Sequence, residues 1–285
     1  MTGTLRAPTD GDVSEVARLM TIGWPEPVDA HQVRHAWSSP RFDRGRDARI
    51  EPRGYAHVDA LDEGRVWINL RGHPSVDLVD WAVERARERG TRVLSGSWVA
   101  NESVLNELRR HGFTVIRHSF RMSIALDDEV AEPVWPDGIR LRTFRDGDAR
   151  AFYEAGNEAF ADTWEPIEPP FEEWAHWMVD TPSFDPDLWF LAEDGVEVAG
   201  FAICKVHPGD AQLGWIQVLG VRKPWRGRGV GRALLVTAFR AFRARGLQRA
   251  GLGVDAQNPT GATRLYESVG MRVADRFEVY ELDVA

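Results

Sequence analysis

The stretch from Arg226 to Gly231 has the composition of an anion-binding turn. It reads Arg-Gly-Arg-Gly-Val-Gly and follows the apolar run 215–221, an order that predicts a strand, a turn and then a helix. Glycines let a backbone approach a bound anion closely, and the first amides of a helix carry partial positive charge toward it. The chain has a formal net charge of -9, so the basic residues at this turn are a local feature. We expect residues 227–231 to bind phosphate groups.

A glycine-rich turn alone can be an ordinary connection between a strand and a helix. The segments that follow this turn indicate which kind of binding site it belongs to. Gly231 is followed by Arg232 and not by Lys-Ser or Lys-Thr, so the turn is not a P-loop. The acid that a dinucleotide fold needs about 20 residues further on is also missing. Instead, an apolar helical stripe ends at Gly246, and a strand is predicted over 250–256. Asn258 and a second helical segment come next.

This series of segments resembles the GNAT superfamily of acetyltransferases. Arg226, Gly229 and Gly231 match the family's coenzyme motif, which is Arg or Gln, two residues, Gly, one residue, then Gly or Ala. Residues 219–221 match the end of the family's fourth strand. Residues 258–271 match the family segment with Asn, Leu-Tyr-Glu and a Gly-Phe pair, with Gly270-Met271 at the position of that pair. The match spans residues 139–285.

The resemblance implies that acetyl-CoA is the co-substrate. Its pyrophosphate would lie on the turn, its pantetheine arm would run along the fourth strand, and the Leu219 N–H would hold the thioester carbonyl as negative charge develops. Asn258 would bind the pantetheine amide, and Arg264 could reach the phosphates. The full set of expected coenzyme contacts is Leu219, Gly220, Val221, Arg226, Gly227, Arg228, Gly229, Val230, Gly231, Asn258 and Arg264.

Tyr266 is expected to protonate the departing CoA thiolate, although an aromatic residue on an amphipathic helix can also be part of the core. Attack by an amine needs a base, because an amine with a pKa of about 10 is almost fully protonated at pH 7. Glu158 and Asp255 are the candidates, and a base acting through water is an open alternative. A covalent role for Cys204 is not expected, since buried cysteines usually pack.

The acceptor side is predicted from an acidic and aromatic segment, 156–168. Glu158, Asp162 and Trp164 are expected to bind a cationic amine through ion pairing and cation–π contact. An acidic solvated face over a tryptophan core is the alternative. The predicted function is N-acetyltransfer from acetyl-CoA to a primary amine of a small molecule, by direct attack in a ternary complex. Protein or peptide N-acetyltransfer and non-catalytic acyl-CoA binding remain open.

The chain also carries an internal repeat. Leu5-Arg6 with Asp10-Gly11-Asp12 recurs as Leu141-Arg142 with Asp146-Gly147-Asp148, and the segment from Asn101 to Phe113 is similar to that from Asn258 to Met271. We therefore predict an α/β (α+β) fold of two tandem GNAT-like domains, each a mixed, mostly antiparallel sheet flanked by helices. The predicted domains are 1–126, which is degenerate and non-catalytic, and 139–285, which is catalytic, joined by an acidic linker, 127–138.

The first copy lacks the features that would bind coenzyme. Pro74 has no N–H to offer, and Val76 is matched with Gly231 of the second copy. The tandem arrangement resembles that of the mycothiol synthases. Those proteins place a glutamate on the fourth strand, where this chain has Trp215 and Gln217.

Composition bounds the remaining possibilities. A single cysteine rules out a disulfide framework, and the absence of a run of about 18 apolar residues argues against membrane insertion. We expect a cytoplasmic protein. An acidic chain with one basic cluster is not expected to bind nucleic acid, and histidine spacing indicates no metal site. Fusion of two copies favours a monomer or a weak homodimer.

Overall fold

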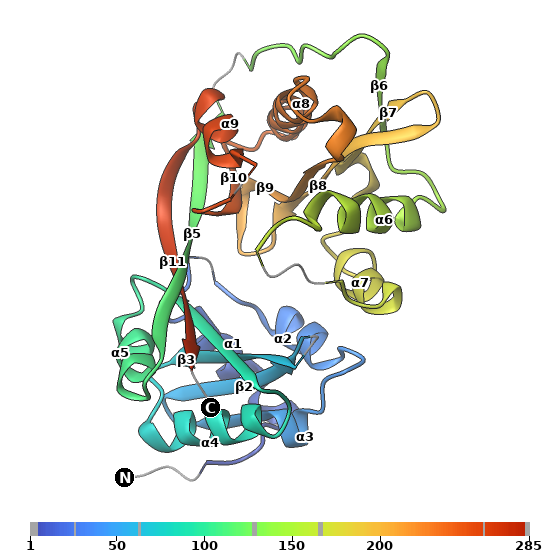
Figure 1. The fold of residues 1–285 in the computed structure, drawn as a ribbon. Helices are drawn as coiled ribbons and strands as arrows, with labels where there is room; N and C mark the ends of the chain where they lie inside the picture. Colours follow the sequence, from blue (N-terminus) through green and yellow to red (C-terminus); the bar gives the residue numbers. More distant parts are fainter. Residues whose placement is uncertain are drawn as a thin grey trace. The chain divides into compact units, whose positions relative to one another are not determined.

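The computed structural model describes residues 5–25, 27–61, 64–126, 130–164, 168–258 and 260–282. The chain forms two compact units, one of Met1–Ser119 with Asp275–Ala285 and the other of Phe120–Ala274. Two long strands, β5 (Thr114–Ala125) and β11 (Arg272–Leu282), each cross from one unit to the other along the chain (Figure 1). The sequence-based boundaries placed all of 139–285 in one domain, whereas the end of the chain here belongs to the first unit. Residues 127–129 of the expected linker lie outside the described residues.

The first unit is a sheet with helices on both faces. Its strands follow the order β1-β2-β3-β4-β11, in which only the β3–β4 pair is parallel. The C-terminal strand pairs with β4 from Phe277↔Trp98 to Leu282↔Val93, and Tyr280 and Leu282 join the core beneath α4 and α5. The elements are η1 (Asp10–Asp12), α1 (Val13–Thr21), α2 (Ala30–Trp37), α3 (Arg44–Asp47), β1 (Ala48–Glu51), β2 (Gly54–Ala60), β3 (Arg65–Gly72), α4 (Val76–Arg87), β4 (Arg92–Trp98) and α5 (Glu102–Arg110).

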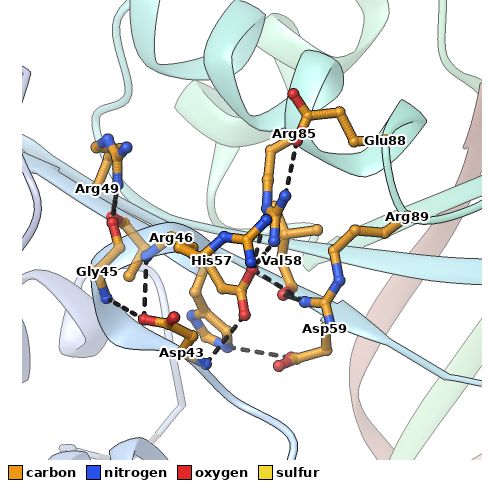
Figure 2. A network of polar contacts seen from close by, with 12 residues as sticks. Asp43, Gly45, Arg46, Arg49, His57, Val58, Asp59, Arg85, Glu88 and Arg89 are labelled. Atoms are coloured by element: carbon orange, nitrogen blue, oxygen red, sulfur yellow. Dashed lines mark hydrogen bonds and ion pairs between the residues drawn. The ribbon is translucent and has the colours of Figure 1, made fainter.

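A buried carboxylate ties α3 to α4 in this unit. The Asp47 side chain is 3% exposed and accepts from Arg85 at 2.6 Å, and Arg89 lies 3.1 Å from the same oxygen. Arg85 also donates to Glu88, and His57 lies 3.3 Å from Asp59 nearby (Figure 2). Because a buried charge is costly without partners, these two arginines are what allow Asp47 to be buried.

The second unit repeats this plan. Its sheet follows the order β10-β9-β8-β7-β6, in which only the β9–β10 pair is parallel. Helix α8 packs on one face, and α6 and α7 pack on the other (Figure 1). The predicted fold class is confirmed. The elements are β6 (Ile139–Thr143), α6 (Ala149–Phe160), α7 (Phe171–Met178), η2 (Pro186–Leu188), β7 (Trp189–Asp194), β8 (Glu197–His207), β9 (Asp210–Val221), η3 (Lys223–Trp225), α8 (Val230–Ala244), β10 (Arg249–Asp255) and α9 (Ala262–Ser268).

Strands β9 and β10 separate at their carboxyl ends. Their pairing ends at Leu252↔Ile216, although β9 continues to Val221 and β10 to Asp255. On its other edge, β9 pairs Ile216 with Cys204 and Val218 with Ile203, which leaves Gln217 as an extra, bulged residue. The bulge and the separation together open the sheet beside residues 217–221. Among the described helices of both units, none is long and apolar enough to cross a membrane.

Candidate active site

Two of the cavities in the second unit share part of their lining. The turn cavity, about 430 Å³, extends from Leu219 to the start of α8, and the sheet cavity, about 450 Å³, lies between α6 and the separated strands. Both volumes suit small ligands. The residues that line both cavities are Phe160, Thr163, Leu219, Asn258 and Tyr266.

The turn cavity presents backbone amides at the start of α8. Gly229 is the N-cap with φ +93°, and the first backbone bond of the helix runs from Ala233 N to Gly229 O. The amides of residues 230–232 therefore precede the hydrogen-bonded part of a 15-residue helix and carry its partial positive charge. A Cβ at Gly227 or Gly229 would meet nothing within 4 Å, so these glycines leave room beside the amides. This arrangement fits a diphosphate.

Arg226 connects the end of β9 to the end of α6 beside this turn. Its guanidinium donates to the Val221 carbonyl at 3.1 Å, to the Ala159 carbonyl at 2.8 Å and to both oxygens of Asp162 at 2.8 and 3.1 Å. The hydrogen bond from Arg226 lowers the pKa of Asp162 to about 2. Sequence reasoning placed Asp162 at the acceptor. The structure instead pairs it with the turn, and Asp162 is not among the described residues that line the sheet cavity.

Glu158, like Asp162, pairs with an arginine next to the turn. Its carboxylate accepts from Arg222 Nε at 2.6 Å, and it lines neither cavity in the described part of the chain. Lys223 lies 3.7 Å from Asp162, so the carboxylates at the end of α6 pair with the basic residues that lead into the turn. Glu158 therefore does not occupy the position of a base. The acids at 158 and 162 and the basic residues at 222, 223 and 226 were the available signal for this pairing.

The other predicted basic contacts lie at the edge of the turn cavity. Arg228 approaches Asp194 at 4.0 Å, and Arg264 is exposed, with its guanidinium over Gly261. Neither belongs to the described lining of the cavity. Arg232 does line it and donates to the Ser268 carbonyl and hydroxyl at 3.0 Å. The backbone amides, and not a ring of arginines, are thus the groups at this turn that are best placed to accept an anion.

Three predicted residues meet where the cavities join. Leu219 lies on the part of β9 that no longer pairs with β10, Asn258 follows β10, and Tyr266 lies on α9. The Tyr266 side chain is buried, and burial raises its pKa to about 12, so the phenol is protonated at neutral pH. The Oδ1 atom of Asn258 accepts from the backbone N–H and the hydroxyl of Thr260, which leaves the N–H groups of the side-chain amide to donate.

The sheet cavity has aromatic walls and two carboxylates among its described lining, Asp255 and Glu168. Trp164, which the sequence predicts to bind the acceptor, also lines it. Gln217, on the bulge, is exposed and also lines it. Cys204 is fully buried in the core under α8, and burial raises the pKa of its thiol, which agrees with a packing role.

Sequence reasoning included Gly156 of α6 only as part of the segment 156–168, and it did not identify Gly253 of β10. Both glycines line the sheet cavity. A glycine inside a helix and one inside a strand were the available signals, because each costs stability there without a local reason.

The first unit has a different connection at the corresponding position. Residues 73–75 alone join β3 to α4, whereas residues 222–229 join β9 to α8. Ser75 is the N-cap of α4, so Val76 corresponds to Val230, and the sequence match of Val76 with Gly231 is one residue off. The Glu51 carboxylate accepts from Ser75 N at 2.7 Å and from the Ser75 hydroxyl at 2.6 Å. An internal anion therefore lies at the start of this helix.

Comparisons with known proteins agree with this geometry. The acetyltransferase (GNAT) family model matches residues 149–271. A mycothiol acetyltransferase from Catenulispora acidiphila is 35% identical over 315 residues, covering 98% of each chain. Among solved structures, a GCN5-related N-acetyltransferase from Sphaerobacter thermophilus has a TM-score of 0.76 with 32% identity, covering 98% of this chain and 95% of its own. A tandem GNAT protein from the clavulanic acid biosynthesis pathway has a TM-score of 0.74 with 14% identity, covering 100% and 98%, and shows the same fold.

A near-full-length relative at this identity, a matching family model and an amide-lined turn at the predicted position agree with one another. The chain belongs to the GNAT family of acetyl-CoA-dependent acetyltransferases.

Proposed function

We propose that the enzyme transfers the acetyl group of acetyl-CoA to a primary amine of a small molecule by direct attack in a ternary complex. The observation that carries this proposal is the meeting of the two cavities at Leu219, Asn258 and Tyr266. Coenzyme in the turn cavity would bring its thioester to this junction, and an amine in the sheet cavity would face it.

The residues at the junction support a single-step transfer. The amine nitrogen forms a bond to the acetyl carbon while the C–S bond breaks, and the Leu219 N–H on the unpaired edge of β9 stabilises the transient oxyanion. The Tyr266 phenol stays protonated until the sulfur leaves and then donates to it. With a pKa of about 12, Tyr266 stabilises the thiolate mainly through a hydrogen bond.

Asp255 is the base that we propose for the amine proton, either directly or through a water. It lies at the end of β10 and lines the sheet cavity, and its Oδ1 accepts from Gln257 N at 3.0 Å. Glu158 is held by Arg222 and is not proposed. A neutral amine and acetyl-CoA give an acetamide and the CoA thiol, and the extra proton of an ammonium substrate is released to solvent.

The test is release of the CoA thiol in the presence of a panel of acceptors. The panel contains small primary amines, peptides with free N-termini and the acceptor of the related mycothiol acetyltransferases. Turnover with small amines, lost in Tyr266→Phe with coenzyme affinity retained, is the expected result. Coenzyme binding without transfer to any acceptor would favour a non-catalytic acyl-CoA-binding module.

We also propose that the first unit does not bind coenzyme. Glu51 already satisfies the start of α4, and a phosphate placed there would meet like charge. Calorimetry should therefore give one acetyl-CoA per chain, and Gly229→Ala should weaken that single site. Two equivalent sites, or a site that persists unchanged in that variant, would contradict this proposal.

A further inference from the structure

Two glycines on opposite walls of the sheet cavity have no structural reason to be glycine. Gly156 lies within α6 and Gly253 within β10, and neither has a positive φ. A Cβ at Gly253 would meet nothing within 4 Å, and one at Gly156 would lie 3.6 Å from Phe201, which is an ordinary contact. The backbone and the local packing would accept a side chain at both positions.

Other glycines of the same sheet behave differently. A Cβ at Gly214 would lie 2.3 Å from Phe242, one at Gly220 would lie 2.5 Å from Phe201, and one at Gly251 would lie 3.0 Å from Trp215. At these positions an internal aromatic ring takes the place of the side chain. At Gly156 and Gly253 the corresponding space is part of the sheet cavity.

The other residues that line the sheet cavity indicate which kind of ligand fits it. Phe160, Trp164 and Trp174 line the cavity and are half-buried, and Phe152 and Phe201 line it from the core. Asp255 and Glu168 supply negative charge. Aromatic walls with a few placed carboxylates favour a cation that is attached to a flat apolar group.

We propose that Gly156 and Gly253 determine acceptor specificity, because their missing side chains make room for a primary amine carried on an aromatic or similarly flat apolar group. This inference rests on the proposed function of the same site. It adds which acceptors fit and which two positions set that limit.

The experiment uses the full chain and three probes of increasing size, ethylamine, benzylamine and tryptamine. Both kcat/KM and the Kd of each amine for the enzyme–CoA complex are measured for the wild type, Gly253→Ala, Gly253→Val and Gly156→Ala. Glu154→Ala, on the exposed side of α6, is the matched control. The wild type is expected to prefer tryptamine.

A side chain introduced at either glycine should reduce the turnover of large amines more than that of small ones. We expect Gly253→Val to lower kcat/KM for tryptamine by on the order of tenfold or more, with Gly253→Ala intermediate. Ethylamine turnover should fall much less than tryptamine turnover, and the Kd of acetyl-CoA should change by less than about threefold. Gly156→Ala should lower tryptamine turnover while raising the urea midpoint, because alanine favours the helix more than glycine does. A merely structural glycine would show the opposite change in stability.

The outcomes separate this inference from the proposed function. If the wild type acetylates no amine but binds tryptamine, and the variants weaken that binding selectively, the proposed function fails, whereas the inference that the two glycines make room for a flat amine ligand is supported. If amines are acetylated but the variants reduce all three equally, or not at all, the inference is overturned. Failure of the wild type to bind either aromatic amine also overturns it.

Discussion

Gly229 offers a sharp test of coenzyme binding by the turn. Its φ of +93° is costly for any residue with a Cβ, and it is the N-cap of α8. Gly229→Ala should cost roughly 1–2 kcal/mol if the conformation is kept, with no added clash, because a Cβ there meets nothing within 4 Å. If φ instead relaxes to a negative value, the peptide next to Val230 rotates and an amide no longer faces the ligand.

The two effects can be separated with a matched control at the other end of the same helix. Gly246 has φ +78°, a Cβ there would also meet nothing within 4 Å, and it lines neither cavity. Gly246→Ala should therefore lose a similar amount of stability, roughly 1–2 kcal/mol, without affecting coenzyme affinity.

The expected loss of coenzyme affinity is that of one hydrogen bond from a backbone amide to the pyrophosphate. A hydrogen bond to a charged group contributes about 1.5–3 kcal/mol, which corresponds to a Kd for acetyl-CoA that is about 10- to 100-fold weaker in Gly229→Ala. Isothermal titration calorimetry gives the affinity, and urea unfolding gives the stability of each variant. Equal Kd values in Gly229→Ala, Gly246→Ala and the wild type would refute binding of pyrophosphate by these amides.

Three further predictions concern the junction and the first unit. Tyr266→Phe should lower kcat by about 100-fold or more while the Kd of acetyl-CoA is nearly unchanged, as stopped-assay kinetics and calorimetry would measure. If the tyrosine is purely structural, kcat and coenzyme affinity should fall by the same factor. The rate should rise from pH 7 to 10 as the neutral amine accumulates. Because burial raises the Tyr266 pKa to about 12, the phenol stays protonated in this window, and a decline centred below pH 10 would speak against its role. Asp47→Ala should lower the free energy of unfolding by about 3 kcal/mol, since Arg85 and Arg89 lose a buried partner; urea denaturation measures this, and a change under about 0.5 kcal/mol would show that the ion pairs contribute little.

The geometry of the turn that we expect to bind coenzyme could be predicted because its determinants are local. Gly227, Gly229 and the start of α8 lie within a few residues of one another, and their backbone geometry follows from glycine and from helix formation. Tyr266 and Asn258 could be placed through the spacing of a recurring segment. The tandem fold followed from the internal repeat.

The acceptor side could not be predicted as well, because a carboxylate's partner depends on which elements pack together. Glu158 and Asp162 are close in sequence to Trp164, which does line the sheet cavity. The guanidinium groups that bind these two carboxylates, however, come from residues 222–226. A carboxylate pairs with the cation that the fold brings closest to it. Asp255 lines the cavity only because β10 separates from β9 before it.

The sequence by itself determined the glycine turn, the helix that follows it, the tandem repeat and the aromatic and acidic composition of the segment beside the acceptor, since each depends on residues close together in the chain. Tertiary structure alone decided that Arg226 holds Asp162, that Glu51 occupies the start of α4 and that the C-terminal strand completes the first sheet. These three contacts join residues far apart in sequence, and the chain brings them together only when hydrophobic packing and strand pairing fix the positions of whole elements.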